Sequence, residues 1–311
     1  MIQIPGTDLT VSDIGLGTVK AGITYETADE LISAFLSEGG NLIDTARIYS
    51  DWIPGEIGRS ERVVGDAIAR LGVRSRVVLM TKGGHPDISN GFDNMPKRMS
   101  PADMRYDLEQ SLRALQTDVI DIYVYHRDDP DQPVPEEIEV METFRREGKI
   151  RWYACSNWTA DRMSEADVYC KEHGYRGFIC DQSLLNAGVP RMLTPSDPTL
   201  TVVKDEVYAY HVKNPDNVLM PFSSVAEGYF HRLLLKGEGG GDYDTEGNRA
   251  FAKKIPALQE KYGATITQVL LGYFRTMPFT CIPLFGPRDV SQLSDAMKAM
   301  EIPFTEEDYR L

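Results

Sequence analysis

Short apolar runs alternate with longer amphipathic segments from Asp13 to the end of the chain. This alternation is typical of βαβ units, in which a buried parallel strand is followed by a helix that packs against it. Eight such runs in 311 residues predict an α/β protein built as a closed (β/α)8 TIM barrel rather than an open doubly wound sheet. The runs are DIGLG (13–17), NLID (41–44), VVLMTK (77–82), DIYVYH (121–126), IRWYACS (150–156), GFICDQ (177–182), NVLMPFS (217–223) and FTCIPL (279–284).

The segments between the runs have the periodicity of helices. In TADELISAFLSEG, apolar residues recur at helical spacing from Leu31 to Leu36, and Gly39 provides a stop signal. In SPADMRYDLEQSLRAL, serine is placed as an N-cap and proline follows at the first helical position. Further helices are predicted to begin at Ser60, Ser100, Pro135 and Thr159.

The first eleven residues predict a β-hairpin that closes the N-terminal end of the barrel, because Ile2 and Ile4 alternate around a Pro-Gly-Thr-Asp turn. Two polar, turn-rich segments, 186–200 and 237–249, exceed what a plain barrel needs. Both are expected to follow strands and to extend from the C-terminal face. We expect a single domain that spans residues 1–311.

Composition excludes several classes of protein. The 33 Lys and Arg against 47 Asp and Glu give a net charge of −14, so nucleic acid and anionic membranes would be repelled. The N-terminus lacks the basic and apolar regions of a signal peptide, and no apolar run is long enough to span a membrane. The expectation is a soluble cytoplasmic protein without a metal or disulfide framework, since no CxxC pair occurs among Cys155, Cys170, Cys180 and Cys281.

Three chemically distinctive residues end consecutive apolar runs: Asp44, Lys82 and His126. In a (β/α)8 barrel the working side chains lie at the C-terminal ends of the strands, so these three should meet at one mouth. Tyr49 follows Asp44 by five residues and should lie on the adjoining loop. Each residue alone has an ordinary structural interpretation, such as loop capping, but their coincidence at strand ends favours a shared catalytic site.

These residue types suit the reduction of a carbonyl group. A free tyrosine has a pKa of about 10, and a neighbouring ammonium is expected to lower it. Asp44 would keep Lys82 charged and oriented, Tyr49 would give a proton to the carbonyl oxygen, and a neutral His126 would orient that oxygen. The reaction further requires a hydride donor.

No Rossmann fingerprint is present, because the GxG at 15–17 is followed by Lys20 at the position of the third glycine. A nicotinamide cofactor would therefore have to bind across the barrel mouth. Polar and aromatic residues at the ends of the later strands are suited to binding this cofactor. Loop capping explains the presence of the polar residues equally well. The candidates are Ser156, Asn157 and Gln182 for the carboxamide, Phe222 for stacking on the ring, and Ser223 for the pyrophosphate.

The ordered series of motifs resembles the aldo-keto reductases over nearly the whole chain. The motifs are NLIDTARIY, VLMTK, DIYVYHRDD, ACSNW, CDQSLLN, PFSSVAEGYF and IPLFGPRDVSQLSDA. The resemblance implies a (β/α)8 barrel that reduces aldehydes and ketones with NADPH. It also implies the tetrad of Asp44, Tyr49, Lys82 and His126, the carboxamide clamp, the stacking phenylalanine, and a site for the 2′-phosphate and adenine between Gly286 and Ala296 that includes Arg288, Gln292 and Asp295.

Several positions depart from the family's pattern. Gln292 stands where an arginine often grips the 2′-phosphate, and Arg288 falls where a small residue is common. Arg288 would supply the missing charge through a bidentate phosphate contact, so NADP is the expected cofactor, with NAD left open. The other departures are Val19 for an aromatic pocket wall, Leu185 for an aromatic near the clamp, Ser224 for proline and Ala296 for asparagine.

Residues on the loops next to the tetrad are expected to choose the substrate. Charged residues directly after His126 favour a polar carbonyl or polyol, such as a sugar-derived compound, while a salt bridge within the loop is the alternative for them. Neighbouring aromatic residues would supply an apolar wall. The expected rim consists of Tyr25, Trp52, His85, Arg127, Asp128 and Trp158.

Two other functions stay open at this point. Lys82 at a strand end could form the Schiff base of a barrel aldolase, although its carboxylate partner and the carboxamide clamp do not serve that chemistry. A regulatory barrel that binds the cofactor without turnover is the second alternative. The complete tetrad weighs against it, and the irregular cofactor segment favours it.

Overall fold

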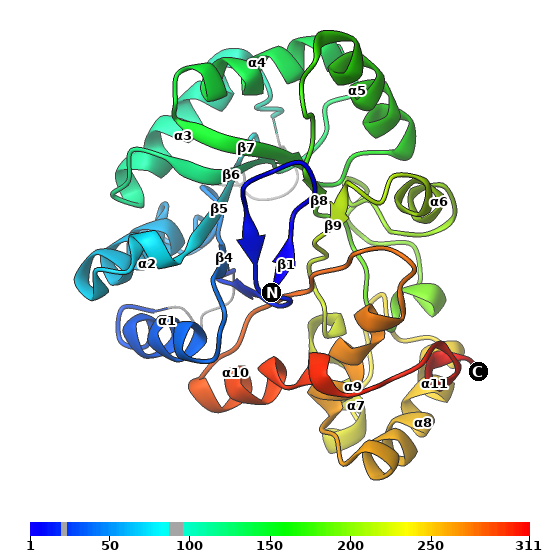
Figure 1. Cartoon of the computed structure of the whole chain (residues 1–311). Coiled ribbons are helices and arrows are strands. Elements are labelled where there is room, and N and C mark those ends of the chain that lie inside the picture. Colours follow the sequence, from blue (N-terminus) through cyan, green and yellow to red (C-terminus); the bar gives the residue numbers. More distant parts are fainter. Residues whose placement is uncertain (20–23, 87–95) are drawn as a thin grey trace.

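Eight parallel strands form the central sheet of the computed structural model, which describes residues 1–19, 24–86 and 96–311 (Figure 1). The sheet closes where Leu219 pairs with Cys281 in parallel and Ile282 N donates to Leu219 O at 2.8 Å. The predicted barrel is therefore confirmed. In sheet order the strands are β10 (Leu284–Phe285), β3 (Gly15–Gly17), β4 (Leu42–Asp44), β5 (Val78–Gly83), β6 (Ile120–Tyr125), β7 (Ile150–Cys155), β8 (Cys180–Asp181) and β9 (Val218–Leu219).

Each of the eight predicted runs overlaps one of these strands, but the last strands are shorter than their runs. In two of the runs a proline interrupts the ladder: Pro221 follows β9, and Pro283 precedes β10. Proline has no backbone N–H to donate, so regular pairing cannot continue through it. The chain still runs alongside its neighbour, because Leu284 N donates to Pro221 O at 3.0 Å.

The helices surround the barrel (Figure 1), and side-chain caps mark where several of them begin. Ser100 accepts a hydrogen bond from Asp103 N, so the predicted N-cap is confirmed. Thr159, where a helix was predicted to begin, also acts as an N-cap and accepts from Arg162 N. In the described part of the chain no helix is both long and apolar enough to cross a membrane. The α-helices are α1 (Ala28–Ser37), α2 (Arg59–Leu71), α3 (Pro101–Ala114), α4 (Val134–Arg146), α5 (Ala160–His173), α6 (Asp205–Lys213), α7 (Tyr229–Lys236), α8 (Glu246–Tyr262), α9 (Ile266–Gly272), α10 (Val290–Met297) and α11 (Glu306–Tyr309). Short 3₁₀ turns are η1 (Arg74–Arg76), η2 (Val189–Arg191), η3 (Ala226–Gly228), η4 (Tyr273–Thr276) and η5 (Ala299–Glu301).

The N-terminal hairpin, β1 (Ile2–Gln3) and β2 (Thr10–Val11), lies across the N-terminal mouth of the barrel (Figure 1). Ile4, Leu9 and Val11 are buried in one cluster with the inward residues of the strands, among them Leu42 and Met80. The hairpin thus seals the apolar interior from below, as predicted, and leaves the opposite end of the barrel for chemistry.

The two long polar segments pack against each other, but only one of them follows a strand. Segment 186–200 comes after β8, whereas 237–249 comes after α7, so the prediction that both follow strands is wrong for the second. The reason is that α7 forms between β9 and this segment. Leu193 N donates to Asp242 O at 2.8 Å, and Asn186 Nδ2 donates to the Tyr243 hydroxyl at 2.9 Å.

Gly65 allows α2 to approach the end of α3, and we predict that Gly65→Ala destabilises the barrel. A Cβ at this position would lie 2.4 Å from Ala114 O and 2.7 Å from Leu115 Cα, so backbone would have to move. Overpacking of this kind costs about 1–3 kcal/mol. Denaturation by urea measures the loss.

The control is Gly247→Ala in the first turn of α8, where the three atoms nearest to the new Cβ all belong to the side chain of Arg191, the first at 3.2 Å, and none is backbone. We expect its free energy of unfolding to change by less than about 0.5 kcal/mol. Equal losses for the two variants would show that helix packing at Gly65 is not the cause.

Candidate active site

The alternation of side chains along the strands brings three of the predicted catalytic residues to the same mouth. On β5, Val78 and Met80 face the barrel interior, and a further step of two residues places Lys82 on the same side. The same step along β4 and β6 leads to Asp44 and to His126, directly after β6. All three side chains are buried at the C-terminal end of the barrel, opposite the hairpin.

The Lys82 ammonium is the centre of the site. Its Nζ donates to Asp44 Oδ1 at 2.7 Å, to the backbone oxygen of Thr45 at 2.7 Å and to the Tyr49 hydroxyl at 3.1 Å. An ammonium has three donors, and all three are used. A Schiff base needs a free amine, so this arrangement disfavours an aldolase that works through Lys82.

The loop after β4 carries Tyr49 back over Lys82. Beyond the end of β4, Arg47 N still donates to Lys82 O at 3.1 Å, which extends the pairing with β5. A turn follows, closed by a bond from Tyr49 N to Ala46 O at 3.1 Å. The step of five residues from Asp44 to Tyr49 therefore spans one short extension and one turn.

Burial dominates the protonation of this group. It raises the pKa of the Asp44 carboxyl, while the Lys82 ammonium opposes the rise. Burial alone would lower the pKa of Lys82, but attraction to Asp44 and Tyr49 outweighs burial, and that pKa is raised. Burial also raises the pKa of Tyr49 more than Lys82 lowers it, so the predicted net lowering of the phenol's pKa is wrong.

His126 lies beside the phenol as a neutral imidazole. Its ring centroid is 5.7 Å from that of Tyr49 and 4.7 Å from that of His85, with edge-on geometry in both pairs. Burial, followed by His85 and Arg127, holds the pKa of His126 well below its usual range. Burial likewise lowers the pKa of His85 to about 4. The Nδ1 atom of His126 is buried without a hydrogen-bond partner among the described residues, so the ring has unused hydrogen-bonding capacity.

The three residues predicted to hold a carboxamide come together at the ends of β7 and β8. Ser156 Oγ donates to Gln182 O at 2.7 Å, and Asn157 Nδ2 donates to Ser156 Oγ at 2.9 Å. Gln182 Nε2 donates to Asp44 Oδ1 at 3.1 Å, which links this group to the tetrad. The side-chain amide of Gln182 is thus next to the Lys82–Asp44 pair, and the amides of Gln182 and Asn157 are both held in place by hydrogen bonds within the protein.

The loop after β9 has an unusual backbone. Ser223, Ala226 and Glu227 all have positive φ angles, of 52°, 50° and 52°, although none is glycine. Such conformations cost free energy and concentrate where a ligand is bound. Phe222, directly before them, is only half-buried, and Ser224 Oγ fixes the loop to the barrel by donating to Leu284 O at 2.5 Å.

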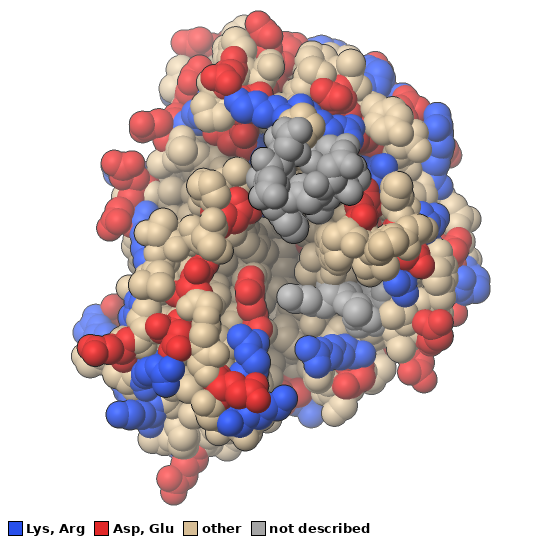
Figure 2. Space-filling view, turned by 180° about the vertical axis from the view of Figure 1, so that it is seen from behind, with Lys and Arg blue, Asp and Glu red and all other residues tan. Residues whose placement is uncertain are grey.

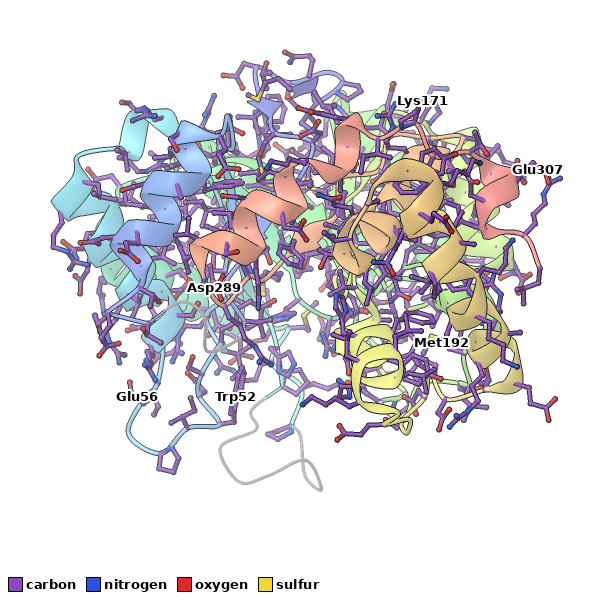
Figure 3. All side chains as sticks on the ribbon, turned by 90° about the horizontal axis from the view of Figure 1, so that it is seen from below. Trp52, Glu56, Lys171, Met192, Asp289 and Glu307 are labelled. Atoms are coloured by element: carbon purple, nitrogen blue, oxygen red, sulfur yellow. The ribbon has the colours of Figure 1, made fainter. Side chains whose placement is uncertain are left out.

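The segment after β10 presents one exposed arginine. Gly286 is half-buried at the strand end, and the start of α10 is capped by Asp289, which accepts from Gln292 N at 2.8 Å (Figure 3). Gln292 Oε1 in turn accepts from Arg288 N at 3.1 Å. The Arg288 side chain makes no hydrogen bond or ion pair with the described residues, so its guanidinium is available to an anion.

Asp295, predicted to contact the cofactor, is half-buried and binds the neighbouring helix. Its carboxylate accepts from Thr265 Oγ at 2.7 Å and from Gln268 Nε2 at 2.9 Å, at the N-terminus of α9. This carboxylate therefore joins α10 to α9. The resemblance to the aldo-keto reductases suggested Asp295 as a cofactor contact but did not predict its bonds to α9.

The predicted substrate rim is only partly assembled. The C-terminal face is hollowed near its centre (Figure 2), and exposed Trp52 projects from the loop after β4 at the edge opposite the hairpin (Figure 3). Tyr25 is also exposed, and His85 contacts His126. Arg127 lies close enough to lower the pKa of Tyr49.

Two of the predicted rim residues belong to the protein's own packing. Trp158 is 0% exposed, its ring lies 4.9 Å from that of Phe178, and its Nε1 donates to Arg127 O at 3.3 Å, so it is a core residue and not a pocket wall. Asp128 forms a largely buried ion pair with Arg162 at 2.8 Å. The alternative of a salt bridge is thus the better one for Asp128, although its partner comes from α5.

Sequence reasoning named segment 186–200 as a long loop after β8 but singled out none of the residues of this loop that contact the site. Thr201 N donates to Asn157 Oδ1 at 3.1 Å, and Thr201 Oγ donates to Asn157 O at 2.8 Å. Just before it, Asp197 and Thr199 contact Arg127. The length and polarity of this loop indicated a functional role. The search for site residues at the C-terminal ends of strands could not show which residues of a long loop point toward the site.

Comparison with known proteins places the chain among oxidoreductases. The model of the Aldo/keto reductase family matches residues 13–311. The chain is 29% identical to "Uncharacterized oxidoreductase YrpG" of Bacillus subtilis, covering 98% of this chain and 92% of that one. It is 26% identical to "Norsolorinic acid reductase B" of Dothistroma septosporum (97% and 77%) and 26% identical to "Aryl-alcohol dehydrogenase [NADP(+)]" of Phanerodontia chrysosporium (97% and 82%).

We predict that Asp44→Asn lowers the stability of the protein by about 3–5 kcal/mol, because it leaves the Lys82 ammonium buried without its counter-charge. Urea denaturation at neutral pH measures the change. Asp29→Asn removes an exposed carboxylate paired with Arg70 at 2.8 Å and should cost less than about 1 kcal/mol. A loss at Asp44 no larger than the loss at Asp29 would contradict a charged, buried Lys82.

Proposed function

The chain belongs to the aldo/keto reductase family, and from this premise we propose that it reduces an aldehyde or ketone with NADPH, using Tyr49 as the proton donor. It is an NAD(P)-dependent oxidoreductase, and the proposal concerns which residues perform the reaction. The supporting observation is the Lys82 ammonium, which binds Asp44 and Tyr49 at the same time. A phenol held on a buried cation is suited to giving up its proton.

In the proposed reaction the cofactor, when bound, supplies a hydride to the carbonyl carbon. The carbon–oxygen π bond breaks as the oxygen takes the proton of the Tyr49 hydroxyl, which leaves a phenolate beside Lys82. The ammonium stabilises this phenolate, and neutral His126 donates a hydrogen bond to the same substrate oxygen. In the reverse direction the phenolate accepts the proton of an alcohol.

The raised pKa of Tyr49 suits the direction of reduction. A buried phenol keeps its proton at neutral pH and is therefore ready to act as an acid. Lys82 acts mainly on the product, since it offsets the cost of a buried phenolate. A protonated His126 would be a second buried cation next to Lys82. The lowered pKa of His126 means that the imidazole stays neutral.

The residues at the ends of β7 to β10 fit a nicotinamide cofactor. We assign the carboxamide to Ser156, Asn157 and Gln182, which already form one hydrogen-bonded group. The half-buried ring of Phe222 would stack on the nicotinamide, and the strained loop that begins at Ser223 would hold the pyrophosphate. Gly286, Arg288 and Gln292 line the segment assigned to the adenosine end.

We propose NADP over NAD because of Arg288. Its exposed guanidinium has no ion pair within the described chain and can bind a 2′-phosphate through two parallel hydrogen bonds. The name of one relative, the aryl-alcohol dehydrogenase, includes NADP(+). The four cysteines are unpaired and buried, which suits a reducing compartment, so we place the protein in the cytoplasm.

For the substrate we propose a polar carbonyl compound or the corresponding polyol. The names of two relatives refer to norsolorinic acid and to aryl alcohols. The mouth of this chain combines exposed aromatic residues, Tyr25 and Trp52, with the charges of Arg127 and Asp197. A sugar-derived or otherwise oxygen-rich substrate matches that mixture better than a plain aromatic aldehyde.

Tyr49→Phe should lower kcat for carbonyl reduction by about 10²–10⁴-fold, the usual contribution of a positioned acid, and leave NADPH binding nearly unchanged. Single-turnover kinetics with NADPH and fluorescence titration of the cofactor measure the two effects. Tyr106→Phe, at an exposed position on α3, is the matched control and should keep full activity. Retention of most activity by Tyr49→Phe would remove the phenol from the mechanism.

Arg288→Gln should weaken NADPH binding by about tenfold to a hundredfold, the usual effect of losing a hydrogen-bonded charge, while NADH binding changes little. Parallel titrations with the two cofactors test this. Arg310→Gln removes an exposed positive charge near the C-terminus and should change neither affinity. A similar loss for NADH and NADPH would show that Arg288 does not recognise the 2′-phosphate.

A further inference from the structure

The guanidinium of Arg127 is held in a fixed position at the barrel mouth. Its Nη1 donates to His126 O at 2.9 Å, and its Nε donates to Thr199 Oγ at 2.9 Å. The third contact is with Asp197 Oδ2, 3.4 Å from Nη2. The side chain is 13% exposed, so it is anchored in the wall of the mouth and does not extend into solvent.

Within residues 1–19, 24–86 and 96–311, the positive charge of Arg127 is only weakly neutralised. Its contact with Asp197 is long for an ion pair, and the Asp197 side chain is 38% exposed. The other carboxylate oxygen of Asp197 is occupied by Thr199, through its N at 2.9 Å and its Oγ at 2.6 Å. Exposure and distance both weaken the attraction between the two charges.

The groups nearest to Arg127 at the reaction site carry no net charge. Lys82 and Asp44 neutralise each other at 2.7 Å. Burial keeps both His85 and His126 neutral, and the field of Arg127 contributes to the lowered pKa of each ring. Arg127 also lowers the pKa of Tyr49, which shows that its charge reaches the proton donor.

The remaining donors of Arg127 match a carboxylate. A guanidinium has five N–H groups, of which three are used by His126, Thr199 and Asp197. Among the described residues no further bond to this guanidinium is present, so one N–H is left on each terminal nitrogen. Two donors on a planar cation are suited to the two oxygens of a carboxylate, which a lysine could not bind in the same way.

We propose that the carbonyl substrate of this barrel carries a carboxylate group, which Arg127 binds next to the Tyr49–His126 pair. The proposal rests on the proposed function, because it assigns the substrate class of the same site. Arg127 makes the site favour acid-bearing aldehydes and ketones over their neutral counterparts, and Asp197 moderates this preference because it competes with the substrate carboxylate.

Matched pairs of substrates test this with NADPH as the reductant. Each pair is an aldehyde acid and its methyl ester, 4-oxobutanoate with methyl 4-oxobutanoate and glyoxylate with methyl glyoxylate, so that two distances between carbonyl and carboxylate are covered. The native enzyme should prefer at least one of the acids over its ester by about tenfold or more in kcat/KM, the usual effect of a charged hydrogen bond. The ratio within one enzyme cancels any general effect of a substitution on the tetrad.

Arg127→Gln should reduce this acid-to-ester ratio to near one, and Arg127→Lys should restore only part of it. Asp197→Asn removes the competing carboxylate and should raise the ratio by lowering KM for the acid. Arg113→Gln, which removes an exposed positive charge on α3, is the control and should leave the ratio unchanged. Circular dichroism and cofactor titration establish that each variant is folded, and Asp197→Asn decides the matter if Arg127→Gln does not fold.

The outcomes separate the two proposals. Absence of turnover with every acid and ester, with NADPH bound, would overturn the proposed function itself. Reduction of acids and esters at equal kcat/KM by the native enzyme would overturn the carboxylate proposal and leave carbonyl reduction standing. An acid preference that persists in Arg127→Gln would likewise reject Arg127 as the residue that binds the carboxylate.

Discussion

The buried ion pair of Lys82 and Asp44 is the interaction on which the arrangement of the site depends. A cation inside a barrel is tolerated only with a partner, and removing one member of such a pair costs several kcal/mol. Asp44 lies opposite Met80 in the parallel register, so Lys82 is one inward position closer to the mouth. Its side chain therefore contacts Asp44 on one side and Tyr49 on the other.

The same burial determines the protonation of the surrounding groups. It keeps the phenol of Tyr49 protonated and the imidazole of His126 neutral, and each is the form that carbonyl reduction requires. Because the Lys82–Asp44 pair is neutral overall, the electric field at the mouth comes mainly from Arg127 and from Asp197, which lies 3.4 Å from it. We therefore assign proton transfer to the buried part of the site around Lys82, and selection of the substrate to Arg127 and Asp197 at its edge.

The fold was predictable because it follows from a repeated pattern. Each apolar run became a strand, and the step of two along β5 from Met80 to Lys82 placed the lysine inside the barrel. What could not be predicted depends on packing between distant segments. Trp158 follows a strand end as a pocket residue would, yet it turns into the core against Phe178, and the carboxylate of Asp295 is occupied by α9. The direction of the Tyr49 pKa shift could not be predicted either, because the sequence does not reveal how deeply the phenol is buried.

The backbone oxygen of His126 joins the two halves of the site. It accepts from Arg127 Nη1 at 2.9 Å, on the side assigned to the substrate, and from Asn157 Nδ2 at 3.4 Å, on the side assigned to the cofactor. Asn157 also holds Thr201, and with it the segment that carries Asp197. A shift of the Asn157 amide on cofactor binding would therefore change the contacts that Arg127 makes with His126, Thr199 and Asp197. Because these contacts share residues, the cofactor half and the substrate half of this mouth form one hydrogen-bonded unit rather than two independent sites.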